Sequence, residues 1–350
     1  MIDNPNILIC YNEPFSKYDN YIGKESTSSD VKLDLSESEF QKNLYIIQDS
    51  IKKKYNNVNS ISFNGSIERL IKNINRIKPD IIYNFVESID GDATFESYAV
   101  GMLEILGIEY TGSNAICLGN CLNKNRTKQI LRYNNIRTPN YFIYKFKSKF
   151  NRDNFNLEFP VILKLIHEDA SIGISEKSVV YNFTELIKQL DFLAETYDQD
   201  VIIEEYIDGR ELNISILGGT ILPISEIIFN DLPDNLPRIV TYEAKWSPES
   251  IYYNHSNPIC PANLSSRLKK IINTFALRAY KSLDCRDYAR VDIRLSKNNL
   301  PYIIEINPNP DISIDSGFVR SAEAFGLSYD KLLLTILNFA INRLKNDKEN

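Results

Sequence analysis

The stretch at residues 289–310, ARVDIRLSKNNLPYIIEINPNP, constrains the fold most strongly, because it has the alternation expected of two paired strands around a tight turn. Side chains of a strand point alternately to its two faces, so the apolar positions must share one face of the pair. This face is predicted to hold Val291, Ile293, Leu295, Tyr302, Ile304 and Ile306. A two-residue turn at Asn298 and Asn299, both tolerant of positive φ, sets the register.

In this register Asp292 lies opposite Glu305, and Arg290 lies opposite Asn307, all on the other face. Hard cations such as Mg²⁺ bind carboxylate and phosphate oxygens, and a nearby arginine can neutralise charge on a transferring phosphoryl group. The pattern therefore favours a metal-nucleotide site. The alternative is a surface hairpin with a solvated polar face, on which Arg290 and Asp292 are cross-strand ion-pair partners, because exposed pairs are common and weak. The hairpin alone leaves both interpretations open.

The composition indicates a soluble globular protein of two or three domains, with 350 residues, 43% hydrophobic and 25% charged. A net charge of -6 without a basic stripe argues against nucleic acid as the main partner. No apolar run is long enough to cross a bilayer, and the start, MIDNPNILICYNEP, has neither a basic region nor a long apolar stretch. We therefore expect a cytoplasmic protein without a membrane partner.

The cysteines and histidines do not form a recognisable metal-binding pattern. The cysteines stand at positions 10, 117, 121, 260 and 285. Their spacing is not that of paired metal ligands, and their odd number argues against a disulfide framework, so buried thiols are expected. With His167 and His255 as the only histidines, a histidine cluster is excluded.

Alternating strand and helix patterns in the first third predict an open α/β sheet. The predicted strands are residues 7–10 and 80–86, and the predicted helices are 40–54, 98–106 and 124–133. Residues 16–38 are polar and serine-rich without periodicity, which indicates a mobile loop or an irregular excursion. A domain boundary near residue 120 is expected.

From residue 159 the pattern changes to that of compact α+β units. The predicted elements are strands 161–165, 178–181 and 201–207 around a helix at 183–197, then strands 211–217 and 222–229 and a helix from Ser265 that leads into the hairpin.

Lys164 lies in FPVILKL, on a strand whose Leu163 and Leu165 face the other side. A buried ammonium needs an anionic partner. The polar loop that follows, HEDASIGIS, contains Ser171 and Gly173, which suit the approach of backbone N–H groups to phosphate oxygens. An edge-strand lysine that reaches solvent, followed by an ordinary turn, is the alternative.

Two further segments have binding chemistry. A polar strand end and the turn after it could offer backbone groups to adenine, an apolar slot to its ring and a carboxylate to ribose, or could simply be solvated. This segment contains Glu204, Glu205, Tyr206, Ile207 and Glu211. Lys245 stands beside the only tryptophan, Trp246, where the pair could form a substrate wall. The residues alone favour a packed tryptophan and a solvated lysine.

The order of these motifs resembles the D-alanine–D-alanine ligase branch of the ATP-grasp superfamily, from about residue 79 to the C-terminus. The motifs are LNKNRTKQILRYNNIRTP, FPVILKL, HEDASIG, VIIEEYIDGREL, TYEAKW, CPANL, YARVDIRL and YIIEINPNP. The resemblance implies an α/β protein with an open N-terminal α/β (pre-ATP-grasp) domain at 1–120 and a two-subdomain α+β ATP-grasp fold. The central subdomain with its phosphate loop would span 121–209, and the C-terminal subdomain with metal and acceptor sites would span 210–350.

The resemblance also implies roles for individual residues, and it shifts the interpretation of Lys164, the loop and Lys245 toward function. ATP phosphates would be contacted by Lys124, Lys164, Ser171 and Gly173, with the loop at 168–173 closing over them. Adenine would lie against Glu204, Glu205, Tyr206, Ile207 and Ile304, and ribose against Glu211. Two Mg²⁺ ions, for which Mn²⁺ is an alternative, would be held by Asp292, Glu305 and Asn307. The implied catalytic residues are Arg290, Lys245, Lys164 and Ser171. The implied substrate contacts are Lys245, Arg290, the N–H of Asp311, Ser316 and Gly317.

Several positions depart from the family pattern. The glycine-rich turn and glutamate after the first strand are replaced by CYNEPFSKYD, where Glu13 is a candidate substitute, and the histidine-glycine element is replaced by FVESIDG at 85–91. In the loop, Asp169, Ala170 and Ser171 stand for a small-serine-serine pattern, and Trp246 stands for a tyrosine. A hydroxyl pair that closes the family's site is therefore missing, and closure must differ.

The resemblance implies an ATP-dependent, ADP-forming carboxylate–amine ligase that makes an amide or peptide bond through an acyl phosphate. Its partners would be small-molecule carboxylate and amine substrates of amino-acid type, and a homodimer is usual among similar proteins. One alternative is a true D-alanine–D-alanine ligase of peptidoglycan synthesis, which the altered N-terminal pocket disfavours. Another is a nucleotide-binding protein without catalysis, which the complete set of metal ligands and lysines disfavours.

Overall fold

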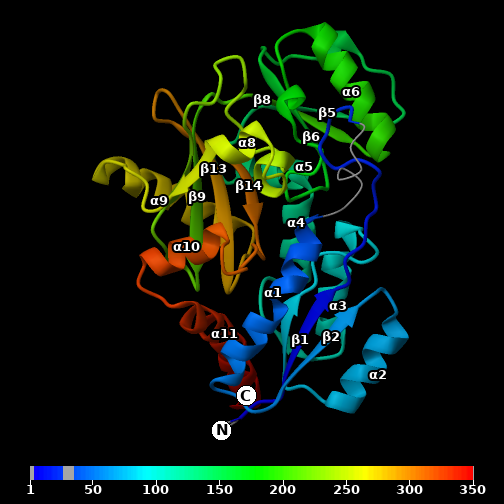
Figure 1. Ribbon diagram of the computed structural model, residues 1–350, viewed down its shortest axis with the longest axis vertical. Coiled ribbons are helices and arrows are strands. Elements are labelled where there is room, and N and C mark those ends of the chain that lie inside the picture. Colours follow the sequence, from blue (N-terminus) through cyan, green and yellow to red (C-terminus); the bar gives the residue numbers. More distant parts are fainter. Residues whose placement is uncertain (1–3, 27–34, 350) are drawn as a thin grey trace.

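The computed structural model describes residues 4–26 and 35–349, which form three sheets with helices packed around them (Figure 1). The first sheet is parallel, with the order β2-β1-β3-β4. Its strands are β1 (Ile7–Asn12), β2 (Val58–Phe63), β3 (Ile81–Phe85) and β4 (Glu109–Tyr110). The helices of this part are α1 (Leu35–Lys52), α2 (Ile67–Ile77) and α3 (Glu96–Ile105), with a short 3₁₀ turn at Ala93–Phe95.

The strands of this sheet are apolar runs because helices cover both of its faces. Ile7 and Ile9 of β1 pack in one core with α1 and with the C-terminal helix α11 (Tyr329–Glu349), whereas Leu8 and Cys10 pack in another with α2 and α3. Figure 1 shows α11 beside α1 although the two lie at opposite ends of the chain. Helix α11 is also tied to the sheet, because Arg343 on α11 forms an ion pair with Glu109 of β4, at 2.8 Å.

The second sheet is antiparallel, with the order β5-β8-β6-β7, and α6 covers one face. Its elements are β5 (Tyr141–Tyr144), β6 (Val161–Leu165), β7 (Val179–Val180), α6 (Phe183–Tyr197) and β8 (Val201–Glu205), with 3₁₀ turns at Arg152–Asn154 and Glu176–Ser178. Leu163 and Leu165 are buried against α6, so Lys164 between them points to the other face. Since β6 lies inside the sheet, the edge-strand interpretation of this lysine is wrong.

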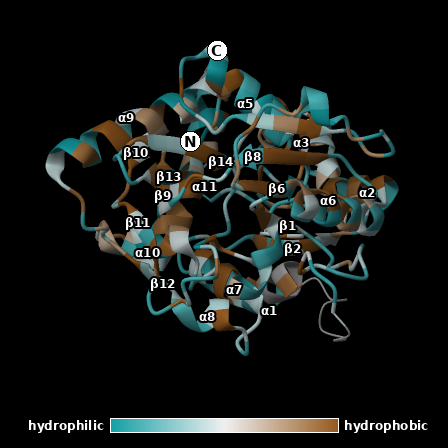
Figure 2. Ribbon diagram, turned by 90° about the horizontal axis from the view of Figure 1, so that it is seen from above, coloured by the Kyte–Doolittle hydropathy of each residue, from teal (hydrophilic) through white to brown (hydrophobic). Residues whose placement is uncertain are grey.

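The third sheet has the order β12-β11-β9-β13-β14, with β10 paired to β9. Its strands are β9 (Gly209–Leu217), β10 (Thr220–Ile221), β11 (Ser225–Phe229), β12 (Ser256–Ile259), β13 (Tyr288–Ser296) and β14 (Pro301–Asn307). Helix α9 (Ser266–Ser282) covers one face and contributes to its apolar core. The remaining helices are α4 (Ala115–Leu122), α5 (Lys124–Tyr133), α7 (Tyr242–Trp246), α8 (Ile251–His255) and α10 (Gly317–Ala324). Seen from above, the middle of the molecule is rich in hydrophobic brown and the outer loops in hydrophilic teal (Figure 2).

The hairpin β13–β14 has the predicted pairing at its polar end and a different path near its turn. Asp292 pairs with Glu305, and Arg290 pairs with Asn307, as expected. The turn is longer by one residue than predicted, because Ser296 pairs with Leu300 and Asn299 has positive φ. A bulge beyond Asp292 compensates, so that Ile303 joins Val291 in the core while Tyr302 and Ile304 are only half-buried, and their predicted core placement is wrong.

Three of the cysteines lie together in the core of the third sheet. All five are free thiols, and Cys117 lies within 4.0 Å of Cys121 and 3.6 Å of Cys285, measured between sulfur atoms. In the part of the chain that the structure describes, no single helix has the length and apolar character to cross a membrane. Helix α10 and residues 329–346 meet that test only as a pair, with a bend of 101° between them.

Candidate functional site

A cavity of about 720 Å³ lies between the second and third sheets, within the size range of small-molecule sites. It is lined by 17 of the 18 predicted site residues, which are Lys124, Lys164, Ser171, Glu204, Glu205, Tyr206, Ile207, Glu211, Lys245, Arg290, Asp292, Ile304, Glu305, Asn307, Asp311, Ser316 and Gly317. Gly173 is the exception. Segments distant in sequence therefore meet at one place.

The acidic face of the hairpin forms one wall of the cavity. Asp292 is buried and accepts two hydrogen bonds from Arg290, at 2.8 and 2.9 Å, which extend along the same strand rather than across strands. Asn213 of β9 and Asn307 of β14 also donate to Asp292, at 2.7 and 3.1 Å. Because β13 is flanked by β9 and β14, the solvated surface hairpin is excluded.

Lys124, the first residue of α5, reaches the same wall. Its ammonium lies 3.1 Å from Glu305 and 3.6 Å from Asp169, and it is almost fully buried. Burial opposes the charged form, but the carboxylates of Glu305 and Asp169 raise the pKa of Lys124 above its usual value. Conversely, Lys124 and then Lys164 lower the pKa of Glu305 despite its burial. Both groups are therefore charged at neutral pH.

Glu204 joins two lysines behind this wall. Its carboxylate lies 3.1 Å from the ammonium of Lys128 and 3.2 Å from that of Lys164. Glu204 and Lys128 each have 1% side-chain exposure. Burial first, and then repulsion by Lys164, lower the pKa of Lys128 to about 8. The sequence missed Lys128, although its position four residues after Lys124 on the same helix places it on the same face.

Arg294 is a second residue that the sequence analysis missed. It is buried and bonds to Glu211 at 2.9 Å and to the carbonyl of Ile207 at 3.0 Å, and it lies over the ring of Tyr206. Strand alternation could have found it, because Arg290, Asp292 and Arg294 are two residues apart and share one face.

In the segment predicted to bind adenine, some of the polar groups already form hydrogen bonds with neighbouring segments of the protein. The N–H groups of Glu205 and Tyr206 donate to the carbonyls of Asn140 and Pro160, at 2.9 and 3.1 Å. The side chain of Glu205 accepts from Asn140. Ile207 and Ile304 are half-buried and line the cavity, where they provide apolar surface for a ring.

The loop at residues 168–173, here called the phosphate loop, is built differently from the prediction. Ser171 lines the cavity and has φ of 64°, in the left-handed region. Gly173 is buried outside the cavity lining, and its N–H donates to the carbonyl of Tyr21 at 2.8 Å. In this structure the N–H of Gly173 is therefore already hydrogen-bonded to the main chain and lies away from the cavity.

Lys245 and Trp246, both on α7, are among the residues that line the cavity. Both are half-buried, and Trp246 packs beside Tyr21, Ile22 and Tyr242. Burial and the charge of Arg290 lower the pKa of Lys245. The two interpretations of this pair thus combine, since the tryptophan packs and the lysine faces the cavity.

The opposite end of the cavity is lined by loops and by the start of α10. Ser316 caps α10 and Gly317 is its first residue, so the helix N-terminus faces the cavity. Asp311 lines this end too. Glu13 does not line the cavity, and its carboxylate accepts a hydrogen bond from Ser62. From the FVESIDG segment, Glu87 takes part in the lining.

The donor set of the hairpin fits a hard divalent cation. Asp292 and Glu305 are directly paired across the strands, Asn307 contacts Asp292, and all three line the cavity. Two carboxylates and an amide oxygen beside space for phosphates are ligands that Mg²⁺ prefers.

Comparison with known proteins supports this picture. A family model described as D-ala D-ala ligase C-terminus matches residues 124–338. The chain is 36% identical over 249 residues to a D-alanine–D-alanine ligase A of Bacillus cereus, covering 71% of this chain and 77% of the relative. It is 32% identical over 263 residues to an uncharacterized protein of Sinorhizobium fredii, covering 75% of each.

A solved structure is similar over almost the whole chain. The crystal structure of a D-alanine–D-alanine ligase from Bacillus anthracis complexed with ATP has a TM-score of 0.74 and 27% identity, covering 97% of this chain and 99% of that one. The similarity therefore includes the N-terminal sheet, which lies outside the matched family model.

Proposed function

This chain belongs to the D-alanine–D-alanine ligase family of ATP-dependent carboxylate–amine ligases, and we propose that it joins two amino-acid-like substrates through an amide bond with release of ADP and phosphate. The observation that carries the proposal is the convergence in one cavity of the acidic hairpin face with lysines from α5, β6 and α7. Lysines at that density suit the phosphates of ATP.

The chemistry requires activation of the acid. A carboxylate oxygen of the first substrate forms a bond to the γ-phosphorus of ATP while the bond to the ADP oxygen breaks, which gives an acyl phosphate. The amine of the second substrate then attacks the acyl carbon, phosphate leaves with the bonding electrons, and the nitrogen loses one proton to give the amide. Water must be excluded, because it would hydrolyse the acyl phosphate.

The residues that line the cavity have different roles in this reaction. Lys124, Lys164 and Ser171 hold the phosphates, and Lys245 in its protonated form acts near the transferred group. The guanidinium of Arg290, held by Asp292, is oriented for an oxyanion at the acyl carbon, with the N–H of Asp311 as a second donor.

Ribose lies against Glu211, and adenine against the wall formed by Tyr206, Ile207 and Ile304, with Glu204 and Glu205 at its edge. Ser316 and Gly317 contribute the N-terminus of α10 to the substrate carboxylate. The division into 1–120, 121–209 and 210–350, and the prediction of a cytoplasmic homodimer, belong to this proposal, and the three sheets support the division.

Asp292, Glu305 and Asn307 would hold two Mg²⁺ ions, with Mn²⁺ as the alternative. When bound, the metal neutralises negative charge on the terminal phosphates of ATP. Lys124 lies 3.1 Å from Glu305, so it is placed to act beside the metal on the same phosphates.

A substrate matrix tests the proposal. The purified protein with MgATP is offered pairs of D- and L-amino acids and small acids, and each well is scored for phosphate release and for product mass. We expect ADP, phosphate and one amide product in equal amounts for the correct pair. D-alanine alone separates a true D-alanine–D-alanine ligase from a ligase with another first substrate. Absence of ADP formation across the panel would contradict catalysis and support a nucleotide-binding protein.

A further inference from the structure

A seven-residue segment, 18–24, runs across the outside of the phosphate loop and is here called the strap. It belongs to the part of the chain predicted as a loop. A Cβ atom on Gly23 would lie 2.1 Å from the carbonyl oxygen of Gly173, and Gly23 has φ of 76°. Because only glycine fits there, the two main chains approach as closely as they can. The bond from the N–H of Gly173 to Tyr21 adds to this contact.

Polar side chains fasten the strap on both sides of the phosphate loop. At one side, the hydroxyl of Tyr18 donates to Glu168 at 2.6 Å. At the other side, the carbonyl of Gly23 accepts from Ser175 at 3.1 Å and from Gln189 at 2.9 Å. The loop is therefore held by the strap from its first residue to the turn that follows it.

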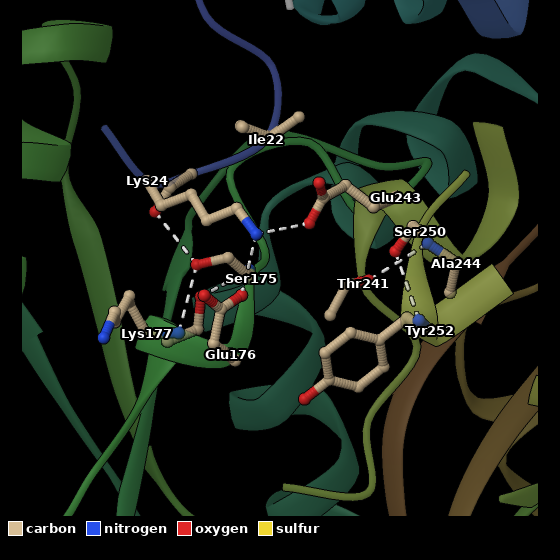
Figure 3. A network of polar contacts seen from close by, with 12 residues as sticks. Ile22, Lys24, Ser175, Glu176, Lys177, Thr241, Glu243, Ala244, Ser250 and Tyr252 are labelled. Carbon is tan, nitrogen blue, oxygen red and sulfur yellow. Dashed lines mark hydrogen bonds and ion pairs between the residues drawn. The ribbon is translucent and has the colours of Figure 1, made fainter. Parts of the chain in front are cut away.

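Lys24 connects the phosphate loop to α7. Its ammonium lies 3.0 Å from Glu176, in the turn after the loop, and 2.6 Å from Glu243, on α7. Figure 3 shows Lys24 pointing between these two carboxylates. The three side chains have exposed fractions of only 20 to 24%, so solvent screens the pairs less than on an open surface.

Apolar contacts join the strap to the same helix. Tyr21 and Ile22 are buried and form one cluster with Tyr242 and Trp246. The ring centroids of Tyr21 and Tyr242 are 5.9 Å apart. Since α7 also carries Lys245, the strap touches both protein segments that lie over the phosphate region of the cavity.

We propose that the strap sets the closed geometry of the nucleotide site, and that Lys24 is a positioning residue that couples the phosphate loop to α7. This inference rests on the proposed function, because it assigns the strap a role in holding ATP. The sequence lacks the hydroxyl pair that closes the family's site. In this chain Lys24, from the N-terminal part, joins the turn after the phosphate loop to α7 through its two ion pairs.

The only tryptophan of the chain allows a direct test, because Trp246 lies in the cluster that the strap covers. Acrylamide quenching of its fluorescence reports strap docking without any catalysis, and titration with MgATP gives the nucleotide affinity. For Lys24→Met we expect stronger quenching and, from the loss of two partly buried ion pairs, about three- to tenfold weaker MgATP binding. Lys24→Arg should restore both. Gly23→Ala should act in the same direction as Lys24→Met, through displacement of the main chain.

The matched control is Lys53→Met, whose ammonium pairs with Asp330 at 2.6 Å on the surface, far from α7. It should leave quenching and MgATP affinity unchanged. In an active pair of substrates, Lys24→Met should also release more phosphate per amide formed, because water reaches the acyl phosphate, whereas a purely structural loss would lower both together. Far-UV circular dichroism confirms that each variant is folded.

Two outcomes would overturn the inference separately from the function. If the wild type binds MgATP and Lys24→Met binds it equally well with unchanged quenching, the strap has no positioning role. If Glu243→Gln and Lys24→Met have fully additive effects on MgATP affinity, the pair does not act as a coupling element. Failure of the wild type itself to bind MgATP would overturn the proposed function and the strap's role with it.

Discussion

Replacing Glu204 with glutamine tests the electrostatic design of the site. Glu204 holds Lys128 and Lys164 at 3.1 and 3.2 Å, and Glu204→Gln removes the charge with little change of shape. We predict that the variant loses about 2 kcal/mol of unfolding free energy at pH 7, and that its stability rises more steeply with pH between 7 and 8 than that of the wild type.

The magnitude follows from the proton affinity of Lys128. In the folded protein the pKa of Lys128 is about 8, against 10.5 for a lysine in water, so keeping it charged costs about 3.5 kcal/mol at about 1.4 kcal/mol per pKa unit. Without Glu204 the carboxylate that raises the pKa of Lys128 is lost, so this pKa falls further and the neutral lysine is favoured. The cost at pH 7 is then limited to that of removing a proton from a group with pKa 10.5, about 5 kcal/mol. Lys128 therefore adds between 1 and 2 kcal/mol, and loss of the Lys164 pair adds about 1 kcal/mol or less.

The pH dependence gives the sharper signature. In the wild type, Lys128 is largely charged in both states well below its folded pKa of about 8, so it contributes little slope near pH 6 and more as the pH approaches 8. In the variant the folded pKa of Lys128 is lower still, so the unfolded state binds more protons than the folded state from a lower pH up to about 10.5, and stability rises with pH by up to about 1.4 kcal/mol per unit. Titration of Glu204 itself does not contribute to the slope at neutral pH. The two lysines lower the pKa of Glu204 despite its burial, so this carboxylate is ionised throughout that range.

Urea unfolding at pH 6, 7, 8 and 9 measures both quantities. The matched control is Glu205→Gln, at the next residue, whose carboxylate accepts hydrogen bonds from the main chain and side chain of Asn140. If Glu204→Gln had wild-type stability at pH 7 and no extra slope between pH 7 and 8, Glu204 would not be what keeps Lys128 charged.

Three further predictions concern activity. Asp292→Asn and Glu305→Gln should lower turnover at least about a thousandfold while the thermal midpoint changes by only a few degrees, and normal turnover in either variant would reject the metal assignment. Because burial and Arg290 lower the pKa of Lys245, kcat/KM should fall as the pH rises through a value below 10.5, and Lys245→Arg should move that limb upward in a pH-rate profile. Arg294→Met should raise the KM for ATP by about tenfold or more, because Glu211 loses its charged donor, and an unchanged KM in an ATP titration would contradict this role.

Long elements with strong local signals were predicted most accurately. The helix at 124–133, the helix at 183–197 and the strand at 161–165 have the predicted bounds. The first two begin after asparagine caps, Asn123 and Asn182, whose side chains accept from the helix N-terminus. Strands β2 and β5 were not predicted, because their residues are only half-buried and their sequences lack a clean alternation.

The site residues were found where a motif or an alternating strand marked them, and missed where a tertiary contact decides their role. Arg294 could have been recognised by its position two residues after Asp292. The contact between Gly173 and Tyr21 could not, because it joins segments about 150 residues apart and depends on backbone geometry that no local pattern encodes. The polar, irregular segment at 16–38 gave no signal for its packing either. Of that segment, residues 27–34 lie outside those that the structure describes, and residues 35–38 belong to helix α1, so the loop prediction is wrong for these four residues.

The polar pairs of the hairpin were predicted correctly, although the predicted turn was one residue too short. A turn longer by one residue shifts the register by one, which alone would move Glu305 away from Asp292 and turn it to the other face. The bulge beyond Asp292 restores the register, so the apolar face changes at Ile303 and Ile304 while the acidic pair is retained. The bulge also brings Ile304 to the cavity, where an ideal hairpin would have buried it in the core. The irregularity therefore places an apolar side chain and two carboxylates on the same wall, which a regular alternating strand cannot do.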